Sequence, residues 1–129
     1  MAARDPEVIV LTGASGGIGT ALARELAGPG RLLALIARDK EKLEALAEEV
    51  RGQGAEAETA ALDIRDRDAL HAFLEDLDRR HPVDLVIANA GVTAGLGPGR
   101  SREADHEADR QIDINYRGAV NTVTGVVEP

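Results

Sequence analysis

A glycine-rich segment near the start of the chain has the composition of a phosphate-binding turn. Residues 12–19 read TGASGGIG, directly after an apolar run and at the start of an amphipathic stretch. A pyrophosphate needs closely approaching backbone, unsatisfied amide N–H groups and the positive end of a helix dipole. Glycine permits both the approach and the unusual dihedrals, and the hydroxyls of Thr12 and Ser15 could add donors. A tight turn that binds nothing would also use glycines, so the context must decide.

Apolar runs that alternate with amphipathic stretches supply that context, because they predict βα units around a parallel sheet. We expect strands at 8–11, 32–36, 56–62 and 83–88, the third of them an edge and the fourth apolar throughout. The helix at 18–27 should place Ile18, Leu22 and Leu26 on one face. Asp39 should cap the second helix, and Asp66 or Asp68 the third. A long helix, bent near Asp113, should cover residues 104–127.

Composition indicates one acidic globular domain and excludes several other classes of protein. The 129 residues are 43% hydrophobic, contain no cysteine and carry a net charge of −8. We therefore expect no disulfide, no thiolate metal site and no sequence-independent binding to nucleic acid. No apolar run approaches the roughly 20 residues of a membrane span, nor does the N-terminus read as a signal peptide, so we expect a cytoplasmic protein.

No metal site is expected either. The three histidines, at 71, 81 and 106, lack metal-ligand spacing. Asp105, Asp109 and Asp113 recur every four residues and would share a helix face, where a solvated surface is favoured over a cation.

Four motifs in order along the chain resemble those of the short-chain dehydrogenase/reductase family. They are Thr12-Gly13-x-x-x-Gly17-x-Gly19, Asp63 after the third strand, Asn89-Ala90-Gly91 after the fourth, and Asn115 in the last helix. The resemblance runs from about Glu7 to the last residue. It implies a Rossmann-like α/β fold, a doubly wound parallel sheet truncated to about four strands in the order 3-2-1-4, within a single partial NAD(P)-binding domain at 1–129.

The resemblance also implies which residues bind a nicotinamide dinucleotide. Asp63 would lie beside the adenine, Asn89–Gly91 under the cofactor, and Asn115 in the active site. The complete set of cofactor-binding residues expected from it is Gly13, Ser15, Gly16, Gly17, Ile18, Gly19, Arg38, Asp63, Ile64, Asn89, Ala90 and Gly91. Two of these sites have a plainer interpretation: Asp63 could cap a turn, and Asn89–Gly91 could be an ordinary strand exit.

The end of the second strand favours NADP over NAD. An NAD-binding unit usually has an acid there that holds the ribose 2′-hydroxyl. This strand ends Ile36-Ala37-Arg38-Asp39, with alanine in the expected place of the acid. The guanidinium of Arg38 would pair with a 2′-phosphate. Asp39 is the competing candidate for the hydroxyl, but helix capping explains it equally well.

The residues that perform the family's chemistry are missing from this sequence. The family transfers a hydride to or from a carbonyl or alcohol carbon, using a serine and a Tyr-x-x-x-Lys pair. Here the only tyrosine, Tyr116, has Val120 four residues later, and the only lysines are Lys40 and Lys42. The serines are Ser15 and Ser101, the latter in a glycine-rich loop expected to be mobile. We expect Tyr116 in the core, on an apolar stripe with Ile112, Ala119, Val123 and Val126.

The chain is about half as long as usual for the family and ends where a fifth strand should begin. The fourth strand and the last helix would then expose apolar surface, which predicts self-association through either or both. Two functions follow. The first is an NADP-dependent oxidoreductase represented by its cofactor-binding half, acting on a small carbonyl or alcohol substrate if completed. The alternative is a non-catalytic dinucleotide-binding or self-assembling module.

Overall fold

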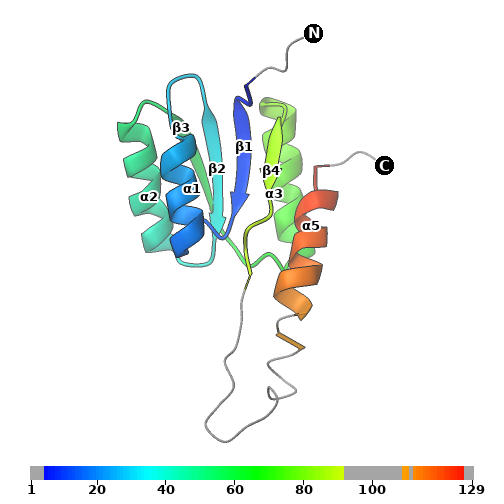
Figure 1. Cartoon of the computed structure of the whole chain (residues 1–129). Coiled ribbons are helices and arrows are strands. Elements are labelled where there is room, and N and C mark those ends of the chain that lie inside the picture. Colours follow the sequence, from blue (N-terminus) through cyan, green and yellow to red (C-terminus); the bar gives the residue numbers. More distant parts are fainter. Residues whose placement is uncertain (1–4, 92–108, 111, 127–129) are drawn as a thin grey trace, which may run out of the picture.

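A parallel four-stranded sheet forms the centre of the molecule (Figure 1). The computed structural model describes residues 5–91, 109–110 and 112–126. Its strands are β1 (Val8–Thr12), β2 (Leu32–Ala37), β3 (Glu56–Ala61) and β4 (Leu85–Ile87). Their order, β3-β2-β1-β4, confirms the predicted topology.

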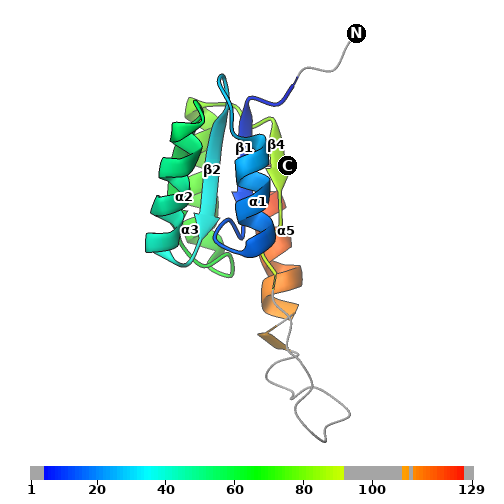
Figure 2. The same ribbon diagram turned by 60° about the vertical axis from the view of Figure 1, so that its left-hand side comes forward.

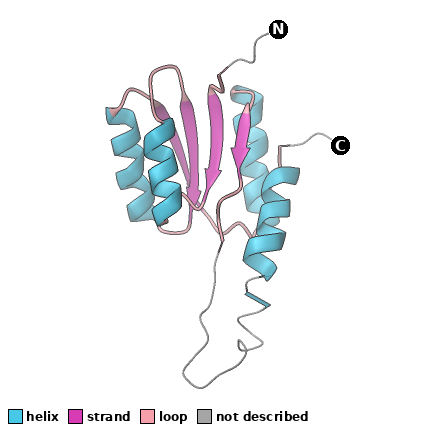
Figure 3. Cartoon of the chain, in the orientation of Figure 1, coloured by secondary structure: helices cyan, strands magenta, loops and turns pink. Residues whose placement is uncertain are grey.

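Helices cover both faces of the sheet, as a doubly wound fold requires (Figures 2 and 3). Helices α1 (Gly17–Leu26) and α2 (Lys40–Gly52) lie on one face. On the other face lie α3 (Arg67–Arg80) and, packed against it, α5 (Ala119–Thr124). A π-helical segment, η1 (Ile112–Gly118), leads directly into α5.

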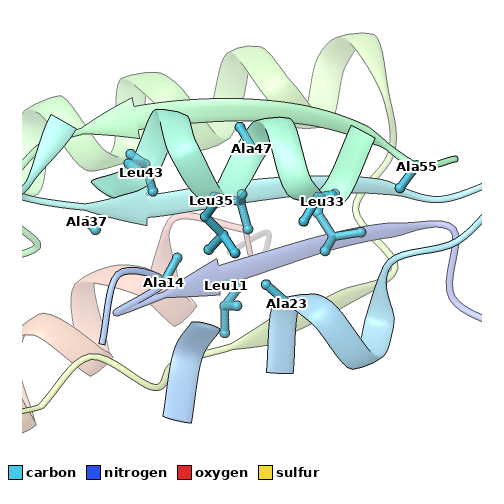
Figure 4. Packing of buried hydrophobic residues seen from close by; sticks show 11 residues of the cluster. Leu11, Ala14, Ala23, Leu33, Leu35, Ala37, Leu43, Ala47 and Ala55 are labelled. Atoms are coloured by element: carbon cyan, nitrogen blue, oxygen red, sulfur yellow. The ribbon is translucent and has the colours of Figure 1, made fainter. Parts of the chain in front are cut away.

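Strand β2 supplies the core on both sides, because all six of its residues are buried. Alternate side chains of a strand point to opposite faces. Leu33 and Leu35 accordingly pack with residues of α1 and α2 (Figure 4), whereas Ala34 and Ile36 pack with the leucines of α3. A continuous apolar run is what a strand covered on both faces needs.

Strand β3 lies at one edge of the sheet, as predicted, and charged side chains border it. Arg80 of α3 donates to both carboxylate oxygens of Glu58, at 2.7 and 2.9 Å. Hydrogen bonding from that guanidinium lowers the pKa of Glu58 below its usual value. The Thr59 hydroxyl donates to Glu44 of α2 at 2.7 Å. These contacts fasten the edge strand to helices on both faces.

Side-chain caps determine where two of the helices begin. Asp39 Oδ1 accepts from the Lys42 N–H at 3.1 Å, which confirms the predicted cap of α2. Asp66, rather than Asp68, caps α3, since its Oδ1 accepts from the Ala69 N–H at 3.1 Å.

Strand β4 is shorter than the strand that we predicted at residues 83–88. The prediction that this run is apolar throughout was wrong, because it contains Asp84, and the strand begins only at the following residue. The Asp84 carboxylate accepts from the N–H groups of Glu7 and Val8, both at 2.9 Å. It thereby joins the start of β4 to the start of β1.

Two predictions about apolar faces were wrong. Ile18, in the first turn of α1, is 72% exposed, whereas Leu22 and Leu26 of the same predicted face are partly buried against the core. Tyr116, expected in the core, is 69% exposed, and Ile112 and Val123 are also exposed. A common helical stripe requires regular α-helical spacing, and the π-helical turn in η1 alters which residues share a face. Residues 104–108, the start of the expected long helix, lie outside the described residues.

Replacing Leu35 with alanine should destabilise the fold. The side chain is fully buried between β2 and the helices α1 and α2, so truncation leaves a cavity. We expect a loss of about 2–5 kcal/mol in the free energy of unfolding. Chemical denaturation followed by circular dichroism measures it, with the exposed Glu41→Ala as control. A loss equal to that of the control would contradict this description of the core.

Candidate functional site

The turn between β1 and α1 closes around the carbonyl group of Gly13. Gly13 has a φ of +66°, in the left-handed region that favours glycine. Its carbonyl oxygen accepts from the Gly16 N–H at 3.2 Å and from Asn89 Nδ2 at 3.4 Å. A Cβ on Gly13 would lie only 2.8 Å from the Cα of Ala90. Glycine is therefore required by both dihedral angle and contact.

Gly19 lets helix α1 pass directly over this turn. A Cβ on Gly19 would lie 2.0 Å from the Gly13 carbonyl oxygen, which no side chain could tolerate. One residue later, the Thr20 hydroxyl donates to the Ala14 carbonyl at 3.0 Å and ties the helix to the turn. Sequence reasoning missed Thr20. Its signal was a hydroxyl residue directly after the last glycine of the motif.

The N-terminus of α1 is left without a protein cap. Gly16 is the N-cap residue and provides no side-chain hydrogen bond to the first turn. The first amides of a helix have no intrahelical partner, so their N–H groups are available to a ligand. A Cβ on Gly17 would meet nothing within 4 Å, which shows open space next to the backbone. This arrangement suits an anion.

A cleft of about 470 Å³ opens at the carboxyl ends of the strands, beside this helix terminus. This volume is within the usual range of ligand pockets. All twelve cofactor-binding residues predicted from the sequence line it, including those that follow β2, β3 and β4. Five further residues complete the lining: Ile36, Ala37, Asp39, Leu62 and Ile114.

Thr12 does not take the donor role that the sequence suggested. It is 1% exposed, and its hydroxyl oxygen accepts from the Ala90 N–H at 3.1 Å. The hydroxyl thus joins the end of β1 to the segment after β4 and supports the floor of the cleft. Ser15 does line the cleft.

Arg38 and Asp63 leave the sheet side by side. The strands that they follow are joined up to their ends, because the Leu62 N–H donates to the Ala37 carbonyl at 3.0 Å. Arg38 is exposed in the cleft, and no acid among the described residues forms an ion pair with it. Ala37 offers no carboxylate, and the Asp39 carboxylate already accepts the capping N–H.

Asp63 both lines the cleft and caps a turn, so its two interpretations are compatible. Its Oδ1 accepts from the Arg65 backbone N–H at 2.9 Å, and its Oδ2 from Arg65 Nη2 at 2.6 Å. Hydrogen bonding from the Arg65 side chain lowers the pKa of Asp63, with a smaller contribution from the charge of Arg38. The carboxyl group is therefore ionised at neutral pH.

Asn115 lies next to the cleft rather than among the residues that line it. A Cβ on Gly91 would lie 3.1 Å from Asn115 Oδ1, so the carboxamide is adjacent to the segment after β4. Tyr116 faces away from the core and lines a second, smaller cleft with Arg65, Asp113 and Arg117. Asp113 forms an ion pair with Arg117 at 3.0 Å.

The described residues form neither a metal-binding cluster nor a membrane-spanning helix. Within them, no three or more histidine, aspartate or glutamate side chains gather as a metal ion would need. None of the helices in that part of the chain is both long and apolar enough to cross a membrane. Ser101, Asp105 and most of the glycine-rich loop lie outside the described residues.

Fold and cleft together define a Rossmann-like α/β domain with a nucleotide-binding type of glycine turn. A family model described as short chain dehydrogenase matches residues 7–129, and the chain belongs to that family.

Relatives and solved structures agree with this assignment. A fatty acyl-CoA reductase of Mycobacterium tuberculosis is 32% identical over 119 residues, which cover 92% of this chain and 40% of the relative. An NAD⁺-bound xylitol dehydrogenase superposes with a TM-score of 0.84 at 30% identity, over 93% of this chain and 46% of the other. An alcohol dehydrogenase from the archaeon Thermococcus sibiricus, complexed with 5-hydroxy-NADP, gives a TM-score of 0.81 at 36% identity, over 93% and 51%. The chain therefore spans about half the length of the proteins it matches.

Two neighbouring glycines should respond oppositely to alanine. Gly19→Ala should lower the free energy of unfolding by at least about 2 kcal/mol, because the new Cβ would collide with the Gly13 carbonyl. Gly17→Ala meets nothing and lies in the first turn of a helix, so stability should be unchanged or slightly higher. Thermal unfolding of both variants tests this. Equal destabilisation would show that the turn is not built around Gly13.

Proposed function

We propose that this chain binds NADP(H) as the cofactor-binding part, residues 1–129, of a short-chain dehydrogenase/reductase-type oxidoreductase. The observation that carries the proposal is a single cleft, lined by all twelve expected residues, beside an uncapped helix N-terminus. The cysteine-free composition supports a cytoplasmic setting as part of the same proposal.

The pyrophosphate would be held by the turn after β1. The open amides at the start of α1 supply donors, and the helix dipole favours negative charge there. Gly16, Gly17, Ile18 and Gly19 would contribute backbone, and Ser15 its hydroxyl. The open space beside Gly17 leaves room for the phosphate oxygens. On the other side of the cleft, Asn89, Ala90 and Gly91 would lie against the nicotinamide ribose, and Asp63 and Ile64 against the adenine.

Charge at the end of β2 favours NADP over NAD. Arg38 is a cation in the cleft without an acidic partner among the described residues. Ala37 provides no carboxylate for a ribose 2′-hydroxyl, and its capping bond to Lys42 gives Asp39 a role that needs no ribose contact. A forked guanidinium matches the geometry of a phosphate.

The reaction proposed is hydride transfer between the cofactor and a small carbonyl or alcohol. The nicotinamide, when bound, supplies or accepts the hydride. Asn115, beside Gly91, is the active-site residue that this chain would contribute. From there a carboxamide can hold a water or a substrate oxygen by hydrogen bonds.

A non-catalytic dinucleotide-binding or self-assembling module is the second candidate. The observation that favours it is Tyr116, which is 69% exposed and is followed four residues later by Val120 rather than a lysine. The family's chemistry uses a lysine one helical turn after the tyrosine, and this sequence has valine at that position. Dinucleotide binding without turnover of carbonyl substrates would support the module. Turnover comparable to that of a full-length relative would exclude it.

Replacing Arg38 with alanine should weaken NADPH binding selectively. Loss of an exposed, charge-assisted hydrogen bond to the phosphate should raise the dissociation constant for NADPH about tenfold. NADH, which lacks the 2′-phosphate, should bind with unchanged affinity. Fluorescence titration of both dinucleotides measures this. Equal affinity of the unmodified chain for NADPH and NADH would count against NADP as the cofactor.

We also propose that two copies associate through α5 and the edge of β4. Ile112, Tyr116, Val120 and Val123 are exposed apolar or aromatic side chains on η1 and α5. Strand β4 is paired on one side only, with β1, among the described strands. A second copy would cover both surfaces by a two-fold contact in which each surface meets its equivalent.

Val120→Asp should shift this chain toward monomer. The Val120 side chain is 44% exposed and belongs to the set of exposed apolar side chains on η1 and α5. An aspartate at this position would bring a charged carboxylate into the proposed interface, where its burial is unfavourable. Sedimentation velocity at micromolar concentration should show the change, with the exposed Gln53→Asp as a charge-matched control. If the unmodified chain is already a stable monomer, the proposed association is wrong.

A further inference from the structure

Three N–H groups of one residue, Arg65, donate to the Asp63 carboxylate and leave about one of its acceptor positions over. Oδ1 accepts from the Arg65 backbone N–H at 2.9 Å, and Oδ2 from Nη2 at 2.6 Å. The Arg65 Nε–H lies 3.1 Å from each oxygen and is shared between them. A carboxylate has about four acceptor positions. Three donors leave room for one further N–H, such as an adenine amino group, but not for a second forked guanidinium.

Arg38 is the second guanidinium that could compete for this carboxylate. The ends of β2 and β3 are hydrogen-bonded, so Arg38 and Asp63 leave neighbouring strands at the same edge, and both line the cleft. The charge of Arg38 also acts on Asp63. Arg38 nevertheless has no ion-pair partner among the described residues, whereas Arg65 takes both oxygens of Asp63.

We infer that Arg65 is a positioning residue that determines cofactor specificity, because by occupying Asp63 it keeps Arg38 free for the 2′-phosphate. This inference rests on the proposed binding of NADP. Without Arg65, Asp63 would pair with Arg38 and withdraw the cation that recognises the phosphate. This loss of the free cation reduces affinity for NADPH more than for NADH, which has no 2′-phosphate.

The surroundings of Arg65 hold its side chain beside Asp63, as the proposed role requires. Its side chain is 41% exposed and borders the second cleft together with Asp113, whose charge attracts it. Asp113 is itself paired with Arg117, so Asp63 remains the acid that Arg65 contacts directly.

The first test compares selectivity, defined as the NADH dissociation constant divided by that for NADPH. Arg65→Ala should lower it by about two- to fivefold, the range that an exposed ion pair permits. Arg51→Ala, with 42% side-chain exposure and an ion pair of its own, is the matched control and should leave selectivity unchanged. A structural role alone would weaken both dinucleotides equally, and that result would overturn the inference.

A double variant separates capture of Arg38 from a general loss of positive charge. If Arg65 acts through Arg38, then Arg38→Ala/Arg65→Ala should have the selectivity of Arg38→Ala alone. A further fall in the double variant would mean that Arg65 acts through its own field, and the inference would be wrong.

A measurement without any nucleotide tests the capture directly. The Asp63 carboxyl can be titrated by ¹³C NMR. In Arg65→Ala its pKa should stay low, because Arg38 replaces the Arg65 side chain, and it should rise in the double variant, where only the backbone N–H of residue 65 still donates to it. Equal titration of the two variants would overturn the inference while leaving NADP binding intact. Failure of the unmodified chain to bind either dinucleotide would overturn the proposed function and this inference together.

Discussion

The close approach of three backbone segments at Gly13 is the constraint on which the rest of the site depends. Strand β1 ends there, α1 crosses above it, and the segment after β4 passes beside it. A Cβ would meet Ala90 at 2.8 Å from Gly13 and the Gly13 carbonyl at 2.0 Å from Gly19, so both positions must be glycine. This packing directs the uncapped end of α1 toward the carboxyl ends of the strands. The cleft therefore depends on close backbone contacts at Gly13 and Gly19 that a side chain at either position would prevent.

Topology explains why the remaining site residues meet at this place. From β1 the chain proceeds to β2 and β3 on one side, and β4 then lies on the other side of β1. The strand order therefore reverses at β1, and the connections on its two sides lead away from each other. In such sheets a crevice forms at this point, outside the carboxyl ends of the strands. Residues immediately after each strand, such as Arg38, Asp63 and Asn89, therefore border one cleft although they are far apart in the sequence.

Sequence reasoning was most successful where local chemistry determines position. Apolar periodicity predicted the strands, and capping chemistry predicted the role of Asp39, whereas the strand order and the lining of the cleft were expected from the family resemblance. Sequence reasoning failed where the outcome depends on what covers a surface. Periodicity grouped Tyr116 with apolar neighbours but could not reveal the π-helical turn that leaves it exposed. Likewise, the Thr12 hydroxyl could be recognised as a donor or acceptor, but only the fold shows that it is buried against Ala90.

The two margins of the sheet differ in character, and this difference limits how copies could combine. At β3, the Arg80–Glu58 ion pair and the Thr59–Glu44 hydrogen bond surround the outer strand with fixed charge and polar groups. At β4, three apolar residues form a short, half-buried strand without such protection among the described residues. Strand addition at both margins would permit open-ended fibres, whereas addition at one margin ends with a pair. The charged border of β3 therefore makes β4 the more favourable margin for the proposed pairing of two copies.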